Sequence, residues 1–419
     1  MMRQTGREEG RGLRIRDSPA IAVVAWGLVL PAAACDGRDV RVGEAPLGWG
    51  GTIEAREVRM WTAEILESAP RWRVGVEPVF EVVPDSVRVT FGGMEQRYAN
   101  AATFMPDGRV VVLYSLSGVL DPDSLLLHIL DPASGEETRI PAPRGEEDQP
   151  LKWGHFQLAF HDGEILLMGD NQPPLSRRQG ADVWRADEGG RFTRPPSHTD
   201  ISGALLGIFP DGSLVLAARS GTTDTTLVQS ITAVEPIGAG DDPSDSRGRE
   251  QLFTTAVPRD PNIPQAASMR FAHQARYTTG VSGDTIWIVP TEKPELLAVH
   301  RSGRILLKVE WDAGDRSVPA GAPPAWEGID RFSATTDLHV GADGLIYVEK
   351  VAVREGRPMR GLEWLVFSPE GELMGRLEVP GRFPSFNVLA FGDGALVARA
   401  RDEETGVQEV RVYRFSKSE

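Results

Sequence analysis

The sequence contains a single cysteine, Cys35, among 419 residues. No disulfide can form within the chain, and a zinc site built from several cysteine thiolates is excluded. Basic residues are also scarce relative to acidic ones, because 60 Asp and Glu outnumber 45 Lys and Arg and give a formal charge of −15. Phosphate binding requires clustered Lys and Arg, so no nucleic-acid partner is expected.

Long apolar runs and common catalytic motifs are missing as well. The stretch Ala20–Ala34 is shorter than the roughly 20 apolar residues that a membrane-spanning helix needs. The chain has no HExxH pair, no GxSxG elbow, no GxxxxGK[ST] loop and no EF-hand series. The acids of Asp241–Gly248 lack the closing Glu of a calcium loop, so we interpret this stretch as a solvated loop.

The N-terminus has the pattern of an export signal. Five Arg precede Ala20–Ala34, which is uncharged and ends in small residues before Cys35. We therefore predict a signal peptide over residues 1–34. The run AAAC resembles the lipobox of bacterial lipoproteins, in which the cysteine becomes the lipidated first residue, although Ala32 stands where that family prefers Leu. Cleavage after Ala34 without lipidation, which gives a secreted protein, stays open.

One phrase recurs along the rest of the chain: an apolar segment, a tight turn at Asp and Gly, and a second apolar run. An Asp-Gly pair between two apolar runs is a strong hairpin signal, because both turn positions favour positive φ. The six turns are Asp107-Gly108, Asp162-Gly163, Asp211-Gly212, Gly283-Asp284, Asp343-Gly344 and Asp393-Gly394.

Four of these six units contain a second hairpin with Gly in its turn. These hairpins are expected at Leu125–Ile140, Ala181–Arg194, Leu296–Trp311 and Leu362–Val379. Two hairpins in each unit of about 50 residues match the four strands of a propeller blade. We therefore predict an all-β, six-bladed β-propeller over residues 51–417 with four-stranded antiparallel blades. Unrelated hairpins in a β-sandwich are the alternative.

The last unit is one strand short after Glu409–Phe415. Two strand-like pieces, Glu54–Trp61 and Trp72–Val83, precede the first unit. We expect one of them to join the last blade and close the ring, because an open blade edge invites mispairing. Residues 35–50 are expected to be a flexible tether. The loops Gly238–Glu250 and Val318–Trp326 are expected to be solvated insertions rather than flaps over the ring.

The chain resembles the exported six-bladed propeller proteins of environmental bacteria, many of which carry lipoprotein signals. The entry phrase Ser68–Val82, the PDG turns and the hairpin at Phe367–Leu373 carry this resemblance. More distantly, the pattern is similar to NHL-type binding propellers and to gluconolactonase-like metal hydrolases. The resemblance implies fold and export, and it says little about activity.

Ligands of propellers meet side chains where each innermost strand begins. Counting back from the turns, metal candidates there are Asn100, Asp200, Asp337 and Asn387, and ligand-binding candidates are His155, His273 and Arg276. A gluconolactonase-like calcium site would use such acids and amides, whereas water-filled channels are polar in any case.

From these observations we expect a monomeric binding or scaffolding propeller without catalytic activity or cofactor. It would be anchored through Cys35 at the periplasmic or outer cell envelope and would bind a protein, peptide or carbohydrate. The alternative is a calcium-dependent, lactonase-like hydrolase.

Overall fold

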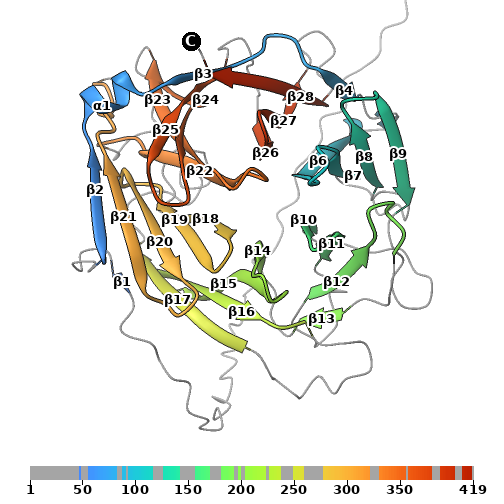
Figure 1. The fold of residues 1–419 in the computed structure, drawn as a ribbon, viewed down its shortest axis with the longest axis horizontal. Helices are drawn as coiled ribbons and strands as arrows, with labels where there is room; N and C mark the ends of the chain where they lie inside the picture. Colours follow the sequence, from blue (N-terminus) through green and yellow to red (C-terminus); the bar gives the residue numbers. More distant parts are fainter. Residues whose placement is uncertain are drawn as a thin grey trace, which may run out of the picture. The chain divides into compact units, whose positions relative to one another are not determined.

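The computed structural model consists almost entirely of β-strands (Figure 1). They lie within one unit of the chain, Val42–Glu419. The only helix of the described residues is α1 (Ala63–Ser68), and no helix there is long and apolar enough to cross a membrane. The structure describes residues 47–48, 55–82, 87–90, 93–116, 126–141, 156–169, 181–192, 197–199, 203–222, 226–236, 249–258, 277–320, 330–354, 357–379, 387–401 and 408–417.

The described strands form five sheets. The first contains β5 (Val87–Thr90), β6 (Gly93–Phe104), β7 (Val110–Leu116), β8 (Leu126–Asp131) and β9 (Glu136–Pro141). The second contains β10 (Phe156–His161), β11 (Glu164–Gly169), β12 (Ala181–Ala186) and β13 (Ser197–Thr199). The third is built on β14 (Ala204–Ile208), β15 (Leu214–Thr222), β16 (Thr226–Val234) and β17 (Arg249–Pro258).

The fourth sheet is built on β18 (Tyr277–Ser282), β19 (Thr285–Pro290), β20 (Glu295–His300) and β21 (Ile305–Trp311). The fifth contains two antiparallel parts. These are β22 (Thr335–Val340), β23 (Ile346–Arg354), β24 (Arg357–Phe367) and β25 (Leu373–Glu378), and then β26 (Asn387–Gly392), β27 (Ala395–Arg401) and β28 (Gln408–Lys417).

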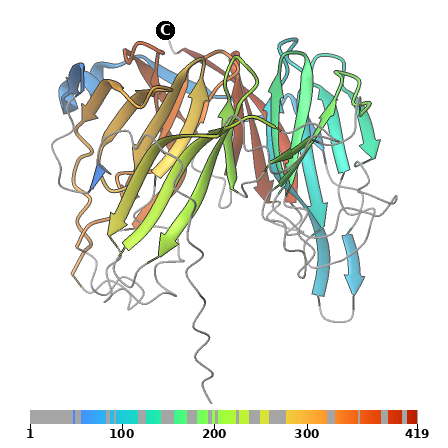
Figure 2. The ribbon, with the colours of Figure 1, turned by 90° about the horizontal axis from the view of Figure 1, so that it is seen from below.

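In the second, third and fourth sheets, and in each part of the fifth, the first of the antiparallel strands given above lies innermost. In the first sheet the innermost strand is β6, and β5 pairs with its extended first half. These inner strands contact one another in a cycle: β6 contacts β10, and the contacts continue through β14, β18, β22 and β26 back to β6. Figure 1 shows the sheets arranged around a common axis. Seen from the side, the β5–β6 hairpin (cyan) extends past its neighbours at one end (Figure 2). This arrangement is a β-propeller.

Four strands from the N-terminal part of the chain run along the outside of these sheets. β1 (Leu47–Gly48), β2 (Glu57–Trp61) and β3 (Arg71–Val74) add parallel outer strands to β17, β21 and β25. β3 also pairs with the end of β28, and β4 (Phe80–Val82) pairs antiparallel with its middle, Val82 opposite Val410.

The outer strands correct two expectations from the sequence. Three of the five sheets are mixed, because β1, β2 and β3 add parallel strands to them, and the described sheets contain four, five or nine strands. The second sheet, β10–β13, is four-stranded and antiparallel as expected. Leu47–Gly48, within the expected tether, pairs in a sheet. Of the two N-terminal pieces, Glu57–Trp61 pairs with β21, and only the second piece reaches β28.

The inner hairpins use two kinds of turn, five-residue loops and two-residue turns. In the loop at 209–213, the N–H of Phe209 donates to the carbonyl of Ser213 at 2.9 Å, and the N–H of Ser213 donates to the Asp211 carboxylate at 3.0 Å. Gly212 has φ 85°. This is a five-residue hairpin loop, with a turn closed by aspartate and then a left-handed glycine. The same backbone bonds recur around Asp107 and Asp343.

Only the hairpin between β10 and β11 has both turn residues at positive φ, with Asp162 at 49° and Gly163 at 76°. The expectation that both positions need positive φ is therefore wrong for the other Asp-Gly turns. In the five-residue loops the Asp side chain caps the turn, so only the glycine takes the left-handed conformation.

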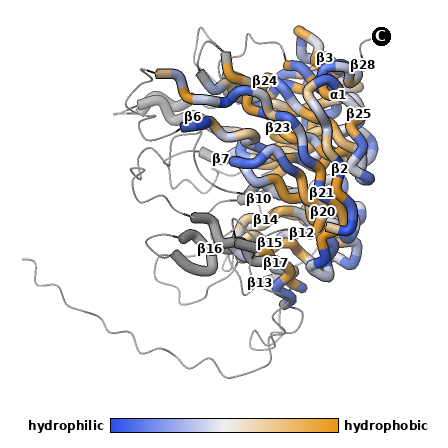
Figure 3. The backbone as a smooth tube through the Cα atoms, turned by 90° about the vertical axis from the view of Figure 1, so that its left-hand side faces the viewer, coloured by the Kyte–Doolittle hydropathy of each residue, from blue (hydrophilic) through white to orange (hydrophobic). Residues whose placement is uncertain are grey.

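Hydrophobic clusters lie between neighbouring sheets. Strand β19 is buried from Ile286 to Pro290, and Trp287 is 1 % exposed. A strand covered on both faces reads as a continuous apolar run, which explains why these segments do not alternate. Figure 3 shows such hydrophobic stretches side by side in neighbouring strands.

Most of the second hairpins form as expected, with one difference. The pairs β8–β9, β20–β21 and β24–β25 follow the predicted segments. In the second sheet, the strand expected near Phe192 is reduced to a single bridge, and Ser197–Thr199 pairs with β12 instead. The loop after β21 returns on itself through a bridge between Ser317 and Arg331. Residues 237–248 and 321–329 lie outside the described part.

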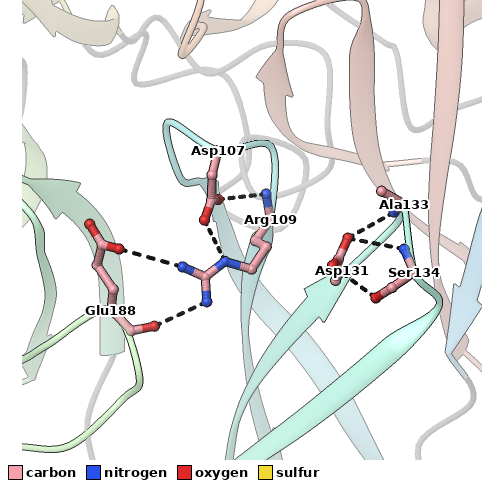
Figure 4. A network of polar contacts seen from close by, with 6 residues as sticks. All are labelled: Asp107, Arg109, Asp131, Ala133, Ser134 and Glu188. Carbon is pink, nitrogen blue, oxygen red and sulfur yellow. Dashed lines mark hydrogen bonds and ion pairs between the residues drawn. The ribbon is translucent and has the colours of Figure 1, made fainter.

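Polar contacts link neighbouring sheets near the Asp-Gly turns. Arg109 contacts Asp107 in its own loop at 2.6 Å and reaches Glu188, beyond β12, at 3.5 Å (Figure 4). Arg301, after β20, contacts Asp211 of the preceding sheet at 2.7 Å. In both contacts the turn of one sheet meets the outer hairpin of the next, with the arginine on the turn in the first and on the outer hairpin in the second.

Candidate functional site

A central cavity of about 1170 Å³ runs along the inner strands. Every inner strand from β6 to β26 contributes to its lining. Except for β6, whose first half pairs with β5, each inner strand is also the edge of its sheet, so among the described strands its backbone groups on the axial side have no neighbouring strand to pair with. Backbone and side chains together therefore make the wall rich in hydrogen-bonding groups.

Three of the residues predicted from the sequence line this cavity: Asn100 on β6, Asp337 on β22 and Asn387 on β26. Asn100 and Asn387 are exposed, and the Asp337 side chain is 41 % exposed. We call the end of the cavity where the inner strands begin the mouth. Asp200, His155, His273, Arg276 and Cys35 lie outside the described residues.

Bulges in the inner strands accompany these residues. The pairing register shifts between Ala99 and Ala101, so Asn100 is the extra residue in β6. A similar shift precedes Asp337 in β22, and another follows Val388 in β26. A bulge turns side chains away from strict alternation, which explains why burial along these strands does not follow a period of two.

The lining also includes polar residues that the sequence reasoning missed. They are Thr103, Gln157, His161, Thr279 and His339. The Gln157 side chain accepts a hydrogen bond from the N–H of Leu205, which joins β10 to β14. Gln157 lies two residues after His155. Counting back from the turns with a tolerance of two residues would therefore have included it among the candidates.

Asp337 and His339 form a pair on β22. One Asp337 carboxylate oxygen accepts from the N–H of Leu338 at 2.9 Å, and the other lies 3.7 Å from His339 Nε2. The His339 ring packs against Trp364 and Phe391, each with a centroid separation of 5.6 Å. This aromatic packing holds the imidazole beside the carboxylate at the cavity wall.

The part of the cavity lining that the structure describes is poor in charge. Among the described lining residues Asp337 is the only carboxylate, and none is Lys or Arg. Arg399, behind Asn387 on β27, donates to the carbonyl of Ala99 at 3.2 Å. Oxygen donors of Asn100, Asp337 and Asn387 are of the type that calcium prefers. However, the described residues contain no group of three His, Cys, Asp or Glu able to hold a metal ion.

The inner strands approach closely where they carry glycine. A Cβ on Gly280 of β18 would lie 2.8 Å from Val340 and 2.9 Å from Leu338 of β22, and a Cβ on Gly392 of β26 would lie 2.7 Å from Phe104 of β6. These contacts lie beyond the starts of the strands. The glycines therefore allow tighter spacing of the inner strands away from the mouth.

A half-buried carboxyl lies beyond the cavity on the turn side. Asp343 accepts a hydrogen bond from the Tyr347 hydroxyl at 2.7 Å. Burial raises the pKa of Asp343 above its ordinary value, the hydrogen bond from Tyr347 opposes this, and the nearby Asp393 adds to the increase. Burial likewise raises the pKa of Tyr347. These groups belong to the contact between β22–β23 and β26, and they do not line the mouth.

Comparisons with known proteins assign no family. No protein-family model matches the chain, and no curated protein matches it. Among solved structures it is similar to regucalcin, a calcium-binding protein of Agrobacterium tumefaciens, with 16% identity over 82% of this chain and 95% of that one, at a TM-score of 0.36.

It is also similar to a member of the DUF4221 family from Bacteroides vulgatus, with 9% identity, coverage of 84% and 98%, and a TM-score of 0.41. The β-propeller domain of Cps50 (Swd1) from Myceliophteria thermophila has 14% identity, coverage of 80% and 99%, and a TM-score of 0.32. Likeness at this level carries no functional argument. The chain is a β-propeller by its own strand order and by the cycle of its inner strands.

Proposed function

We propose that this protein is a non-catalytic binding propeller that holds a small polar ligand of the carbohydrate class in its central cavity. The observation that carries this proposal is the lining of the cavity, about 1170 Å³ in volume, by amide, hydroxyl and imidazole side chains from the inner strands. Such groups donate and accept hydrogen bonds without a net charge, which suits neutral hydroxyl-rich ligands.

The proposal includes a ring of six blades. The cyclic contacts of the inner strands β6, β10, β14, β18, β22 and β26 support this number. The pairing of β4 with β28 supports closure by an N-terminal strand. A chain lacking residues 36–83 is expected to aggregate or to melt at a much lower temperature, because the outer edge of β28 would be open. If this shortened chain melts like the mature protein, closure by β4 is wrong.

The proposal also places the protein at the bacterial cell envelope, anchored by a lipid on Cys35. The support is the sequence order of Arg residues, an apolar stretch and AAAC. Expression with a fatty acid that can be tagged is expected to label the protein, and Cys35→Ser to remove the label. A native chain that still carries residues 1–34 would overturn export.

The binding function is tested by thermal unfolding with neutral mono- and disaccharides. A true ligand stabilises the folded state by about 2.7 kcal/mol at a hundredfold excess over its dissociation constant. Asn387→Ala is expected to remove this shift, because Asn387 is exposed at the mouth. The matched control is Gln251→Ala, an exposed amide on the outer strand β17. No shift with any saccharide, or equal effects of both variants, contradicts the proposal.

A calcium-dependent, lactonase-like hydrolase is the second candidate, favoured by the convergence of Asn100, Asp337 and Asn387 on one cavity. Calcium would supply a positive charge that polarises a bound carbonyl. The discriminating measurement is the melting temperature in calcium, in magnesium and in a chelator. If calcium alone raises it and Asp337→Asn abolishes the rise, the metal site replaces the saccharide site as the leading function.

A further inference from the structure

We propose that two copies of this protein associate through strand β2, whose outer edges pair antiparallel with Val58 of one copy opposite Val58 of the other. The fourth sheets of the two copies then continue into one sheet across a two-fold axis. This inference concerns the outside of the propeller and does not depend on the ligand of the central cavity. It replaces the monomer expected from the sequence.

The first argument is that β2 is an outer edge without the usual protection. It is the last strand of the fourth sheet, and Figure 1 shows it (blue) on the outside of β21. Val58 is 57 % exposed and Met60 is 66 % exposed. The other outermost strands among those described differ: β1 and β13 have only two and three residues, and the exposed residues 136–139 of β9 are all polar. Short length and charge protect a sheet edge from pairing, and the exposed side chains of Val58 and Met60 supply no charge.

The second argument is the direction of the backbone groups of β2. The N–H of Asp312 donates to the Trp61 carbonyl at 3.1 Å, so this carbonyl is directed toward β21. Backbone groups of successive residues in a strand point to alternate sides, so those of Arg59 also face β21, whereas those of Val58 and Met60 face outward. None of the described strands pairs with this side of β2. The N–H and C=O of Val58 are therefore directed toward the position that Val58 of a second copy would take.

The third argument is the charge pattern of the strand. With Val58 opposite Val58, antiparallel pairing places Glu57 of each copy opposite Arg59 of the other. Opposite charges that face each other across two strands stabilise the pairing. A shift that centres the pairing on Arg59 instead would oppose like charges, which destabilise it. The strand is therefore self-complementary in one register, and this favours a second copy of the chain as the occupant of the edge.

The face of the sheet that carries Val58 and Met60 is also suited to an interface. These side chains lie beside Lys308 and Glu310 of β21, which contact each other at 2.5 Å. An apolar centre with a polar rim is the usual composition of a contact between proteins. Because β2 has only five residues, the interface is small, and we expect a dissociation constant on the order of 100 μM.

The first test is sedimentation equilibrium of the full chain carrying Cys35→Ser, which cannot be lipidated. We expect a monomer–dimer equilibrium, and we expect Val58→Lys to raise its dissociation constant by about tenfold or more, because two ammonium groups would meet at the axis. The control is Val76→Lys, which replaces a 69 % exposed valine in the loop after β3 and is expected to leave the equilibrium unchanged. A monomer at every concentration up to about 1 mM, or equal dissociation constants of the two variants, overturns the proposal.

The second test examines the register and does not require the lysine variants to fold. Cys35 is the only cysteine, so Val58→Cys in the chain carrying Cys35→Ser has a single thiol. In the proposed register the two Cα atoms at this position lie about 5.5 Å apart, within reach of a disulfide. The control is Met60→Cys, because the two copies of this position lie about 14 Å apart. Under mild oxidation we expect Val58→Cys to cross-link at least about tenfold faster than Met60→Cys. Equal rates, or faster cross-linking of Met60→Cys, overturn the pairing at Val58.

Discussion

Single residues at the inner turns hold the chain in a conformation that few side chains adopt. Gly212 has φ 85°, and a Cβ at this position would meet no atom within 4 Å. Any loss of stability on substitution therefore comes from the backbone and not from a clash. The same conformation recurs at Gly108 and Gly344, which supports the interpretation of these turns as one repeated loop.

Gly212→Ala is expected to lower the free energy of unfolding by about 1–2 kcal/mol, because an L-residue is strained at this φ. Denaturant unfolding measures the loss. The matched control is Gly75→Ala: Gly75 is outside the left-handed region, and its nearest new contact is an ordinary 3.4 Å from the Arg414 carbonyl oxygen. Equal losses in the two variants would remove the role assigned to the turn conformation.

The raised pKa of Asp343 predicts that the stability of the protein depends on pH. Its folded-state pKa is raised, mainly by burial, so the folded state binds the carboxyl proton more tightly than the unfolded state. The group therefore costs stability above the raised pKa and none below the ordinary value. Asp343→Asn is expected to gain stability relative to the wild type as pH rises from acid through the raised pKa.

The measurement is chemical denaturation of both proteins across that range of pH. The comparison variant is Tyr347→Phe, which removes the hydrogen bond that lowers the Asp343 pKa. It is expected to change stability in the opposite sense at neutral pH. A difference between Asp343→Asn and wild type that is independent of pH would show that the carboxyl titrates alike in both states.

At the scale of elements, the N-terminal strands β2 and β3 have different roles in the sheets. β2 adds one strand to the outside of a single sheet, along β21. β3 pairs both with β25 and with β28, and so joins the two parts of the nine-stranded sheet. Its Trp72 is 5 % exposed and stacks on Phe415 with a centroid separation of 5.8 Å.

Trp72→Ala is therefore expected to lower the free energy of unfolding by about 3–5 kcal/mol, the usual cost of removing a large buried aromatic side chain. Trp61→Ala serves as the comparison, because Trp61 lies on β2 and is only half-buried. It is expected to cost clearly less. Losses of similar size would mean that β3 has no special role in joining the two parts.

At the scale of the whole propeller, the spacing of the inner strands decides the width of the cavity. Gly280 of β18 faces Val340 and Leu338 of β22 at distances that exclude a Cβ. Gly280→Ala must push these strands apart or displace the two aliphatic side chains. Overpacking of this kind typically costs about 1–3 kcal/mol.

Thermal and denaturant unfolding of Gly280→Ala measures this cost. Thr279→Ala is the control, because Thr279 precedes Gly280 on the same strand and lines the cavity. It is expected to change stability little. Saccharide binding is expected to change in both variants, through altered cavity width in the first and a lost hydroxyl in the second. An unaffected stability of Gly280→Ala would show that the strands are not in tight contact there.

The sequence alone determined the hairpins and the all-β class. Asp and Gly in the turns and apolar runs beside them are local signals, and backbone conformation follows from them without knowledge of the rest of the chain. The positions of Asn100, Asp337 and Asn387 on the cavity wall were predictable for the same reason, since counting from a turn locates the start of an inner strand. Their role in binding stays a prediction.

The outer strands, the bulges and the shape of the cavity were decided only by the tertiary structure. Parallel pairing of Glu57–Trp61 with β21 is accompanied by no turn signal, because the two strands are far apart in sequence. Gln157 and His339 enter the lining only when neighbouring inner strands take their final spacing. That spacing depends on glycines meeting side chains of another sheet, such as Gly280 against Val340. Such contacts join distant parts of the chain, so no local pattern encodes them.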